Sequence, residues 1–356
     1  MTHYIKRGNT YNVTANAQMD IQSILPVGTY TVKFNPMEGF FYLEQVSDFE
    51  APGKIYGDTV KVADRILNTF DTRPNATGVM LSGEQGSGKT LQAEIISINA
   101  RKRGVPTFVI NSALAGEAFN TFMQSIEQDI VVLFDEFEKV YDDQEQQALL
   151  TLLDGVYPTK KLFVLTCNDK YRVNKHMKNR PGRIFYHLEY KGLDVEFVRE
   201  YCQDNLIEKG HIEGVERLSM LFAEFNFDML KALVEEMNRY GETPQEALKM
   251  LNAKPDNSEN QFFDFTLEVG GEVLGEDKLY DTRWRGNPLQ ASILINHMTD
   301  EVDSDGDPEY DMVTFTPANL VKVDAQSGTF QFVNEDGDKL SLKKQVAAGY
   351  NYDLLY

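Results

Sequence analysis

The stretch Gly83-Glu84-Gln85-Gly86-Ser87-Gly88-Lys89-Thr90 decides the fold of this chain. It fits G-x-x-x-x-G-K-[ST], the pattern of a phosphate-binding loop between a strand and a helix. Its glycines allow a tight turn that aims backbone N–H groups at phosphate oxygens. We expect Lys89 to reach the terminal phosphates and the Thr90 hydroxyl to bind Mg²⁺. Leu91 opens the following helix, whose positive dipole end adds to the site.

The residues around this loop alternate between strand and helix patterns. Short apolar runs predict strands, and apolar residues at helical spacing separate them. The predicted strands are residues 78–82, 107–110, 130–134, 162–166 and 184–188. Such alternation after a leading phosphate loop predicts an α/β fold with a parallel, doubly wound sheet. The alternative for the loop alone is an ordinary glycine-rich turn.

Polar side chains follow two of the predicted strands. Asp135 and Glu136 end the apolar run 130–134, and Asn168 follows the run 162–166. The carboxyl ends of parallel strands meet at one edge of a sheet, beside the phosphate loop. We expect Asp135 to hold the Mg²⁺ shell, Glu136 to activate the attacking water and Asn168 to position that water. The alternatives are an acidic cap for the carboxylates and a turn former for Asn168.

Arg180 and Arg183 precede the fifth predicted strand in the sequence Arg180-Pro-Gly-Arg183. An ATPase that works as a ring needs cations supplied by a neighbouring subunit, where charge develops on the γ-phosphate. The alternative is that both arginines belong to a solvated turn.

The flanking regions differ from this central part. Residues 1–52 form a predicted β-rich accessory region, with a hairpin around Asn35-Pro-Met-Glu-Gly39. The nucleotide-binding domain is expected over residues 53–190, a helical lid over 191–252 and a polar linker over 253–261. Residues 262–356 form a predicted acidic β domain, since their pattern alternates with period two. The run Asp300–Asp311 lacks the EF-hand pattern, which favours a solvated acidic loop over a calcium site.

Composition limits the function classes. The chain has 356 residues and a net charge of −20, and the part from Pro255 onward carries 20 acidic and 7 basic residues. Nucleic acid is therefore not expected as the main partner. Two cysteines cannot form a disulfide framework, which favours a reducing compartment. No stretch approaches 18 apolar residues, so we expect a soluble, cytoplasmic protein without a membrane segment.

Five motifs together resemble the AAA+ ATPases. They are GEQGSGKT, LFDEFEKV, LLTLLDGV, LTCND and NRPGRI, in this order and spacing, within roughly residues 54–252. The R-x-G-R arrangement of Arg180 and Arg183 is similar to the AAA subgroup. The stretches LSGEQGSGKTLQAEII and TCND are also similar to Rubisco activase-like members of the same broad group.

This resemblance implies an ATPase that binds ATP and Mg²⁺ at the subunit interfaces of a homo-oligomeric ring, usually a hexamer. It implies Walker A at Lys89 and Thr90, Walker B at Asp135 and Glu136, and sensor 1 at Asn168. It also implies arginine fingers at Arg180 and Arg183, and adenine contacts at Ile55-Tyr56-Gly57.

Two departures from the family pattern limit the interpretation. The expected pore loop, Leu114-Ala115-Gly116, has no aromatic residue, and no sensor 2 arginine is evident near Phe227-Asp228-Met229. The leading hypothesis is a ring ATPase that remodels a protein or protein complex through its flanking β domains. The alternatives are a nucleic-acid-associated loader using Arg101, Lys102 and Arg103, and a nucleotide-gated scaffold with slow turnover.

Overall fold

The computed structural model describes residues 3–7, 10–14, 22–154, 160–177, 180–222, 225–252, 262–302, 308–324 and 327–345. The chain forms two compact units. The sheet unit comprises Met1–Ile55, Thr59–Ser82 and Thr90–Leu188. The lid unit comprises Tyr56–Asp58, Gly83–Lys89 and Glu189–Tyr356, so the phosphate loop belongs to the same unit as the lid. The expected linker at residues 253–261 and residues 303–307 of the acidic run lie outside the described residues.

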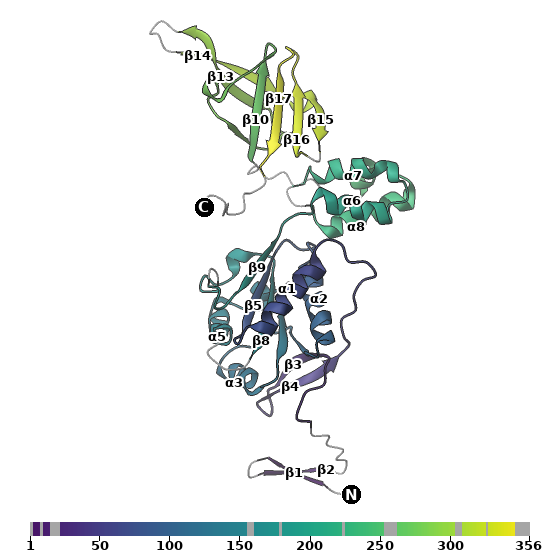
Figure 1. The fold of residues 1–356 in the computed structure, drawn as a ribbon, viewed down its shortest axis with the longest axis vertical. Helices are drawn as coiled ribbons and strands as arrows, with labels where there is room; N and C mark the ends of the chain where they lie inside the picture. Colours follow the sequence, from purple (N-terminus) through teal and green to yellow (C-terminus); the bar gives the residue numbers. More distant parts are fainter. Residues whose placement is uncertain are drawn as a thin grey trace. The chain divides into compact units, whose positions relative to one another are not determined.

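A central sheet dominates the sheet unit (Figure 1). In spatial order its described strands are β4 (Phe40–Val46), β3 (Thr29–Asn35), β6 (Thr107–Ile110), β7 (Ile130–Phe134), β8 (Lys161–Cys167), β5 (Thr77–Gly83) and β9 (Tyr186–Tyr190). The strands from β3 to β5 in this order pair in parallel, which confirms the predicted α/β class. β5 carries the phosphate loop and lies beside β8, where Ser82 pairs with Cys167.

The predicted N-terminal hairpin is present as β3 and β4, but it joins the central sheet. β3 pairs in parallel with β6, from Thr29 opposite Thr107 to Thr31 opposite Val109. β4 pairs with β3 antiparallel and lies at the edge. The accessory interpretation of residues 1–52 is therefore corrected for β3 and β4, because strand pairing makes them part of the nucleotide-binding sheet. The domain boundaries themselves stay a prediction.

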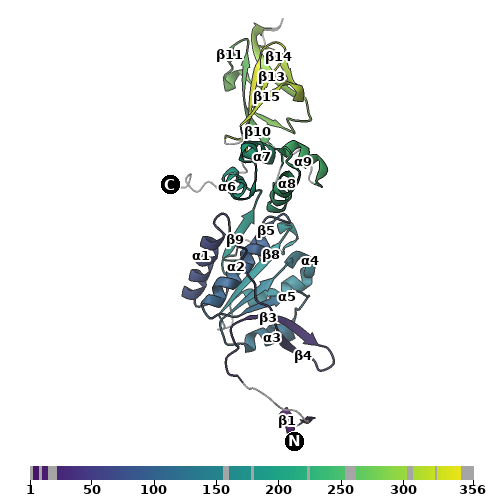
Figure 2. The ribbon, with the colours of Figure 1, turned by 90° about the vertical axis from the view of Figure 1, so that its right-hand side faces the viewer.

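Helices cover both faces of the central sheet (Figures 1 and 2). α1 and α2 lie on one face, and α3 and α5 lie on the other. Their bounds are α1 Thr59–Thr72, α2 Lys89–Lys102, α3 Glu117–Ser125, α4 Phe137–Val140 and α5 Asp143–Leu153. All five residues of β7 are buried, as are those of β8, because each of these central strands has apolar layers on both sides. This arrangement leaves the carboxyl ends of the strands as the place where polar side chains gather.

The predicted lid is helical. Its elements are α6 (Val195–Asn205), η2 (Lys209–His211), α7 (Ile212–Ser219), α8 (Phe227–Tyr240) and α9 (Pro244–Met250). The N-cap of α8 is Asn226, whose side chain accepts a hydrogen bond from the Met229 amide, and its C-cap is Gly241, with a φ of 68°. Its buried face consists of Leu230, Leu233, Val234 and Met237, which pack against the other lid helices.

The C-terminal region is all-β, as predicted. One antiparallel sheet contains β11 (Glu272–Val273), β10 (Phe262–Val269), β17 (Lys339–Lys344), β16 (Thr329–Val333) and β15 (Leu320–Asp324), with β12 (Arg283–Arg285) on β10. β13 (Ile293–Val302) and β14 (Pro308–Phe315) form a separate hairpin. Ile295 and Phe315 of this hairpin share a buried core with Leu267, Phe332 and Leu342 of the sheet. Short 3-10 helices occur at Lys170–Arg172, Glu276–Lys278 and Pro317–Asn319.

Candidate functional site

The glycines of the phosphate loop have left-handed backbone conformations, and the Lys89 side chain binds carbonyl groups of the same loop. Gly83, Gly86 and Gly88 have φ values of 146°, 78° and 95°, a region that glycine adopts without steric cost. A Cβ on Gly83 would lie 2.1 Å from the Tyr190 carbonyl oxygen, so the close approach of β9 excludes any side chain. The buried Lys89 ammonium donates to the carbonyl oxygens of Gly83 at 2.7 Å and Glu84 at 2.6 Å.

The first turn of α8 contacts this loop within the lid unit. The Asn226 amide group donates to the Gln85 carbonyl at 3.2 Å, and the Phe227 N–H donates to the Gly86 carbonyl at 3.1 Å. A Cβ on Gly86 would lie 2.7 Å from the Asp228 carboxylate. The stretch Phe227-Asp228-Met229, which lacks the sensor 2 arginine, therefore places a carboxylate beside the loop.

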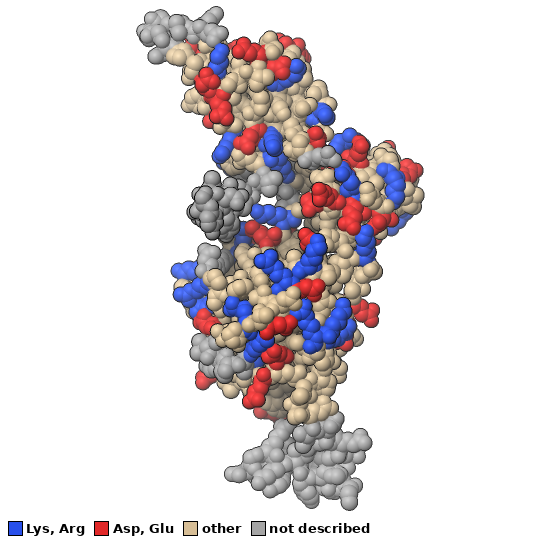
Figure 3. Space-filling view, in the orientation of Figure 1, with Lys and Arg blue, Asp and Glu red and all other residues tan. Residues whose placement is uncertain are grey.

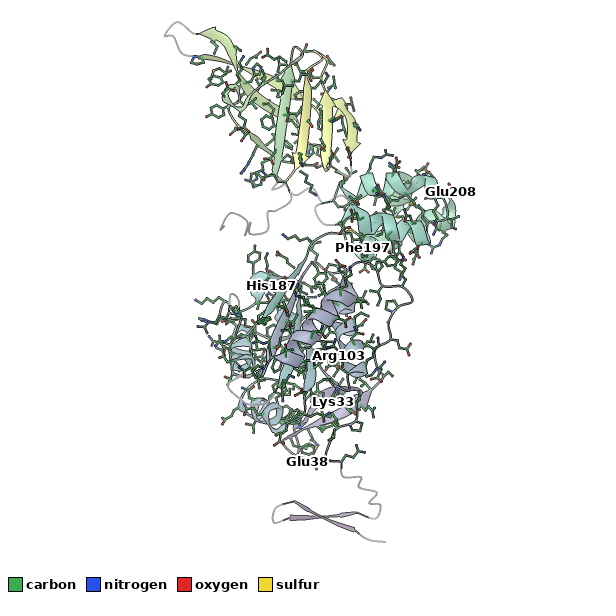
Figure 4. The ribbon with its side chains drawn as sticks, in the orientation of Figure 1. Lys33, Glu38, Arg103, His187, Phe197 and Glu208 are labelled. Atoms are coloured by element: carbon green, nitrogen blue, oxygen red, sulfur yellow. The ribbon has the colours of Figure 1, made fainter. Side chains whose placement is uncertain are left out.

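Tyr56, in the stretch expected to contact adenine, is fixed by the lid. Its hydroxyl donates to the Asp204 carboxylate at 3.1 Å and accepts from the Asn205 amide at 2.8 Å. Its ring lies 5.8 Å from the Phe197 ring and 5.2 Å from the Tyr201 ring, measured between centroids. Figure 4 shows Phe197 in the lid. The aromatic contacts give the segment Tyr56–Asp58 a defined place in the lid unit.

Thr166 joins the two acidic residues that follow β7. Its hydroxyl donates to the Asp135 Oδ1 atom at 2.7 Å and accepts from the Glu136 N–H at 2.8 Å. Thr166 is buried in β8, which pairs with β7 in parallel. One hydroxyl thereby orients Asp135 and fixes the backbone of Glu136 at the carboxyl edge of the sheet.

Glu136 and Asn168 meet at the same edge. The Asn168 side-chain amide donates to the Glu136 Oε1 atom at 3.2 Å, and the Lys139 ammonium donates to the same oxygen. The Asn168 N–H donates at 3.0 Å to Glu138, a carboxylate buried in α4. Glu136 has a φ of 47°, the left-handed region that non-glycine residues rarely adopt. The carboxylate and the amide expected to act on one water molecule are thus in direct contact.

Asp135 also affects a carboxyl group on α2. Burial and the charge of Asp135 raise the pKa of Glu94 above its usual range. Both residues belong to the sheet unit. Among the described residues, no group of three or more His, Cys, Asp or Glu side chains is arranged to hold a metal ion. The Asp135 carboxylate fits Mg²⁺, which proteins bind through one or two carboxylates together with substrate phosphates.

Arg183 is engaged within its own chain. Its Nε and Nη2 atoms donate to the two oxygens of Asp154, the second at 2.7 Å, and Nη1 donates to the His176 carbonyl at 2.7 Å. This bidentate pair lowers the pKa of the Asp154 carboxyl. Arg180 is exposed, and its backbone carbonyl accepts from the amides of Arg183 and Ile184.

The sequence did not single out the residues that hold these groups in place. Thr166 was the polar residue in an apolar strand, and Glu138 was the third acidic residue of Asp-Glu-Phe-Glu, so a weak signal existed for both.

Leu114 of the expected pore loop is partly buried and packs against the main core, and its N–H donates to the Tyr141 hydroxyl at 3.3 Å. No described helix is long and apolar enough to cross a membrane.

The comparisons with known proteins agree with this arrangement. The family model "ATPase family associated with various cellular activities (AAA)" matches residues 79–190. A similar curated protein is the human "Peroxisomal ATPase PEX1", which is 23% identical over 196 residues. The alignment covers 48% of this chain and only 15% of that relative, so the chain spans a small part of its length. Residues 79–190 are therefore similar to the ATPase domain of the AAA family.

Proposed function

We propose that this enzyme hydrolyses ATP at the subunit interfaces of a homo-oligomeric ring, a hexamer by family resemblance, and so remodels a protein or protein complex. The observation that supports the proposal most is the Glu136–Asn168 contact at the carboxyl edge of the sheet. β5 ends at the same edge, beside β8, and the phosphate loop continues directly from it along the chain.

In this proposal the backbone N–H groups of Gly83–Lys89 bind the phosphates. The Lys89 ammonium exchanges the carbonyl oxygens of Gly83 and Glu84 for β- and γ-phosphate oxygens. Thr90 and Asp135 supply the protein oxygens for Mg²⁺, which neutralises charge on the phosphates when it is bound. The stretch Ile55-Tyr56-Gly57 contacts adenine.

Glu136 acts as the base and takes the proton of the attacking water. The Asn168 amide, which donates to Glu136 Oε1, also orients this water. The Lys139 ammonium donates to the same carboxylate oxygen and so helps to hold this side chain in place. Thr166 and Glu138 act through these groups and are positioning residues.

Arg180 and Arg183 are the proposed cations for the neighbouring subunit's γ-phosphate. Arg183 is bound to Asp154 in the single chain, so assembly has to exchange one carboxylate partner for an anionic phosphate. Arginine is suited to both because its planar guanidinium forms bidentate bonds with either group.

A protein target is favoured over nucleic acid. Arg101 pairs with Asp48 at 2.6 Å, and Arg103 pairs with Asp71 at 2.6 Å, so two of the three cations that a loader needs are neutralised. On the face drawn in Figure 3, basic and acidic side chains are interspersed over the sheet unit.

A nucleic-acid loader and a slow, nucleotide-gated scaffold stay alternatives. DNA binding at low salt would support the loader. The cytoplasmic location also stays a prediction.

Mixing two inactive variants tests the shared site. Lys89→Ala removes the phosphate contact and Arg183→Ala removes the trans cation, so each alone should lose most ATPase activity. A mixture should regain activity, because some interfaces pair an intact phosphate loop with an intact arginine. Arg65→Ala, on the exposed face of α1, is the control and should keep the parent rate. The shared site is refuted if Arg183→Ala hydrolyses ATP normally as a dilute monomer.

A further inference from the structure

The edge strand β4 has an open side. Among the residues that the structure describes, β4 pairs only with β3. Natural edge strands are usually protected by lysine, proline, a bulge or a covering segment. The sequence of β4, Phe40-Phe-Tyr-Leu-Glu-Gln-Val46, contains neither lysine nor proline, and its one charged residue, Glu44, pairs with Lys33 of β3. The pairing of β4 with β3 is regular over all seven residues. It is therefore a ready template for another strand.

Aromatic side chains of α3 and β3 also fix the position of β4. The Phe41 ring packs against the rings of Phe119 and Phe122 on α3, with centroid distances of 5.6 Å and 5.3 Å. It also lies 4.8 Å from the Phe34 ring of β3. A strand anchored in this way presents a fixed row of backbone groups at the sheet edge, so little order has to be created when a partner strand binds.

The same chain contains a hairpin that lacks a sheet. β1 (His3–Arg7) and β2 (Thr10–Thr14) pair with each other over five residue pairs. Within the described part of the chain they pair with no other strand. An isolated two-stranded hairpin is marginally stable in water and needs a third strand or a packing partner. The β1–β2 hairpin thus lacks a neighbouring strand, and β4 has an edge at which a strand can be added.

The segment that leads into β3 is held by Gln128. The Leu25 N–H donates to Gln128 Oε1 at 3.0 Å, and the Gln128 amide donates back to the Leu25 carbonyl at 3.2 Å. Gln128 lies two residues before β7, which is on the opposite side of β3 from β4 in the strand order. The chain is therefore fixed at Leu25 before it enters β3, and among the described residues the hairpin that precedes this point does not pair with β4 of its own chain.

Charge favours the same pairing. Residues 1–19 contain Lys6 and Arg7 and no acidic residue, which is unusual in a chain of net charge −20. Residues 34–53 contain four acidic residues and no basic one. Two of these four are engaged in ion pairs within the chain, and the other two, Glu38 and Glu50, are exposed. Figure 4 shows Glu38 at the end of the β3–β4 hairpin.

We propose that β4 of one copy receives the β1–β2 hairpin of a second copy as an added part of its sheet. The main-chain hydrogen bonds of strand addition supply affinity, and the opposite charges of the two segments set the partner. The interface consists of sheet-edge residues and needs no nucleotide. The proposed interface can therefore be tested independently of the proposed ring ATPase.

Zero-length cross-linking in an isotope mixture tests the exchange. Unlabelled and uniformly ¹⁵N-labelled full-length chains are mixed in equal amounts and treated with a carbodiimide, which joins amines to carboxylates in contact. Cross-links from Lys6 to Glu38 or Glu50 are expected, with about half of them joining a light to a heavy peptide. Cross-links of single isotope composition alone would show a hairpin that folds back on its own chain and would overturn the proposal, as would their absence. Chains with Lys89→Ala should give the same result.

Charge reversal provides the second measurement. Lys6→Glu with Arg7→Glu should weaken self-association about three- to tenfold by sedimentation, since exposed ion pairs contribute modestly. Adding Glu38→Lys and Glu50→Lys to the same chain should restore it. Lys322→Glu with Lys343→Glu, in the C-terminal strands, makes the same charge change and should have no such effect. The proposal is also overturned if reversal at residues 6 and 7 leaves association unchanged.

Discussion

Replacing Thr166 by valine removes the hydroxyl that joins Asp135 to Glu136 and keeps nearly the same volume. The side chain is 3% exposed, so water cannot take the place of the hydroxyl. Thr166→Val eliminates the bond to Asp135 Oδ1 and leaves the Glu136 N–H without its acceptor. Thr166→Ser is the matched control, because it keeps the hydroxyl and removes only a methyl group.

The magnitude follows from these two bonds. A hydrogen bond to a charged group contributes about 1.5–3 kcal/mol, and a buried amide without a partner costs about 1–3 kcal/mol. Local relaxation lets part of this loss be recovered, so the free energy of unfolding should fall by about 2–4 kcal/mol. Residues that orient metal-binding carboxylates typically change activity about 10- to 100-fold. We expect kcat to fall by that factor, which corresponds to about 1.4–2.7 kcal/mol in the barrier.

The assay has to separate stability from catalysis. ATPase rates are measured at saturating Mg²⁺-ATP and at a protein concentration where sedimentation shows equal assembly of parent and variant. The only tryptophan, Trp284, lies in β12, so its fluorescence does not report on the central sheet. Amide hydrogen exchange of β7 and β8 measures the local loss instead. A folded Thr166→Val chain with kcat within twofold of the parent refutes the positioning role, and so does an equal loss in Thr166→Ser.

Two further predictions concern the carboxyl groups with altered pKa. Asp154→Ala should lower stability at neutral pH by about 1–2 kcal/mol, a value reduced for partial exposure of the pair. Arg183 lowers the pKa of Asp154, so its stabilisation exists above the usual aspartate pKa and is lost as pH falls; the melting temperatures of parent and variant should converge in acid. Burial raises the pKa of Glu94, so Glu94→Gln should raise the melting temperature at pH 7, with a gain that disappears at low pH. An equal gain at pH 3 contradicts this assignment.

The places of the proposed site residues were predictable because their residue types and positions are local signals. Lys89, Asp135, Glu136 and Asn168 follow apolar strands in the sequence, and the contact between Glu136 and Asn168 follows from two parallel neighbouring strands. The bridge through Thr166 was not predictable in the same way. It depends on the register of β7 against β8 and on the rotamer of one hydroxyl, and neither is encoded in a local pattern.

The limits of local patterns also explain the correction to the N-terminal region. The hairpin of β3 and β4 was predicted correctly, since its turn and its alternating residues are local signals. Its place in the sheet depends on parallel pairing between Thr29 and Thr107, which are far apart in sequence. Parallel pairing leaves no turn signature, so sequence alone could not distinguish an extra domain from an edge of the central sheet.

The left-handed backbone of Glu136 has a consequence for how this chain can evolve. A residue with a Cβ in that conformation costs about 1–2 kcal/mol relative to its usual backbone region. Glycine would relieve that cost, yet glycine has no carboxylate. Under the proposed role of Glu136, selection for stability and selection for hydrolysis act in opposite directions at this one residue. If Glu136 is the base, as proposed, a lineage that kept nucleotide binding but no longer needed turnover would gain stability by replacing this residue first.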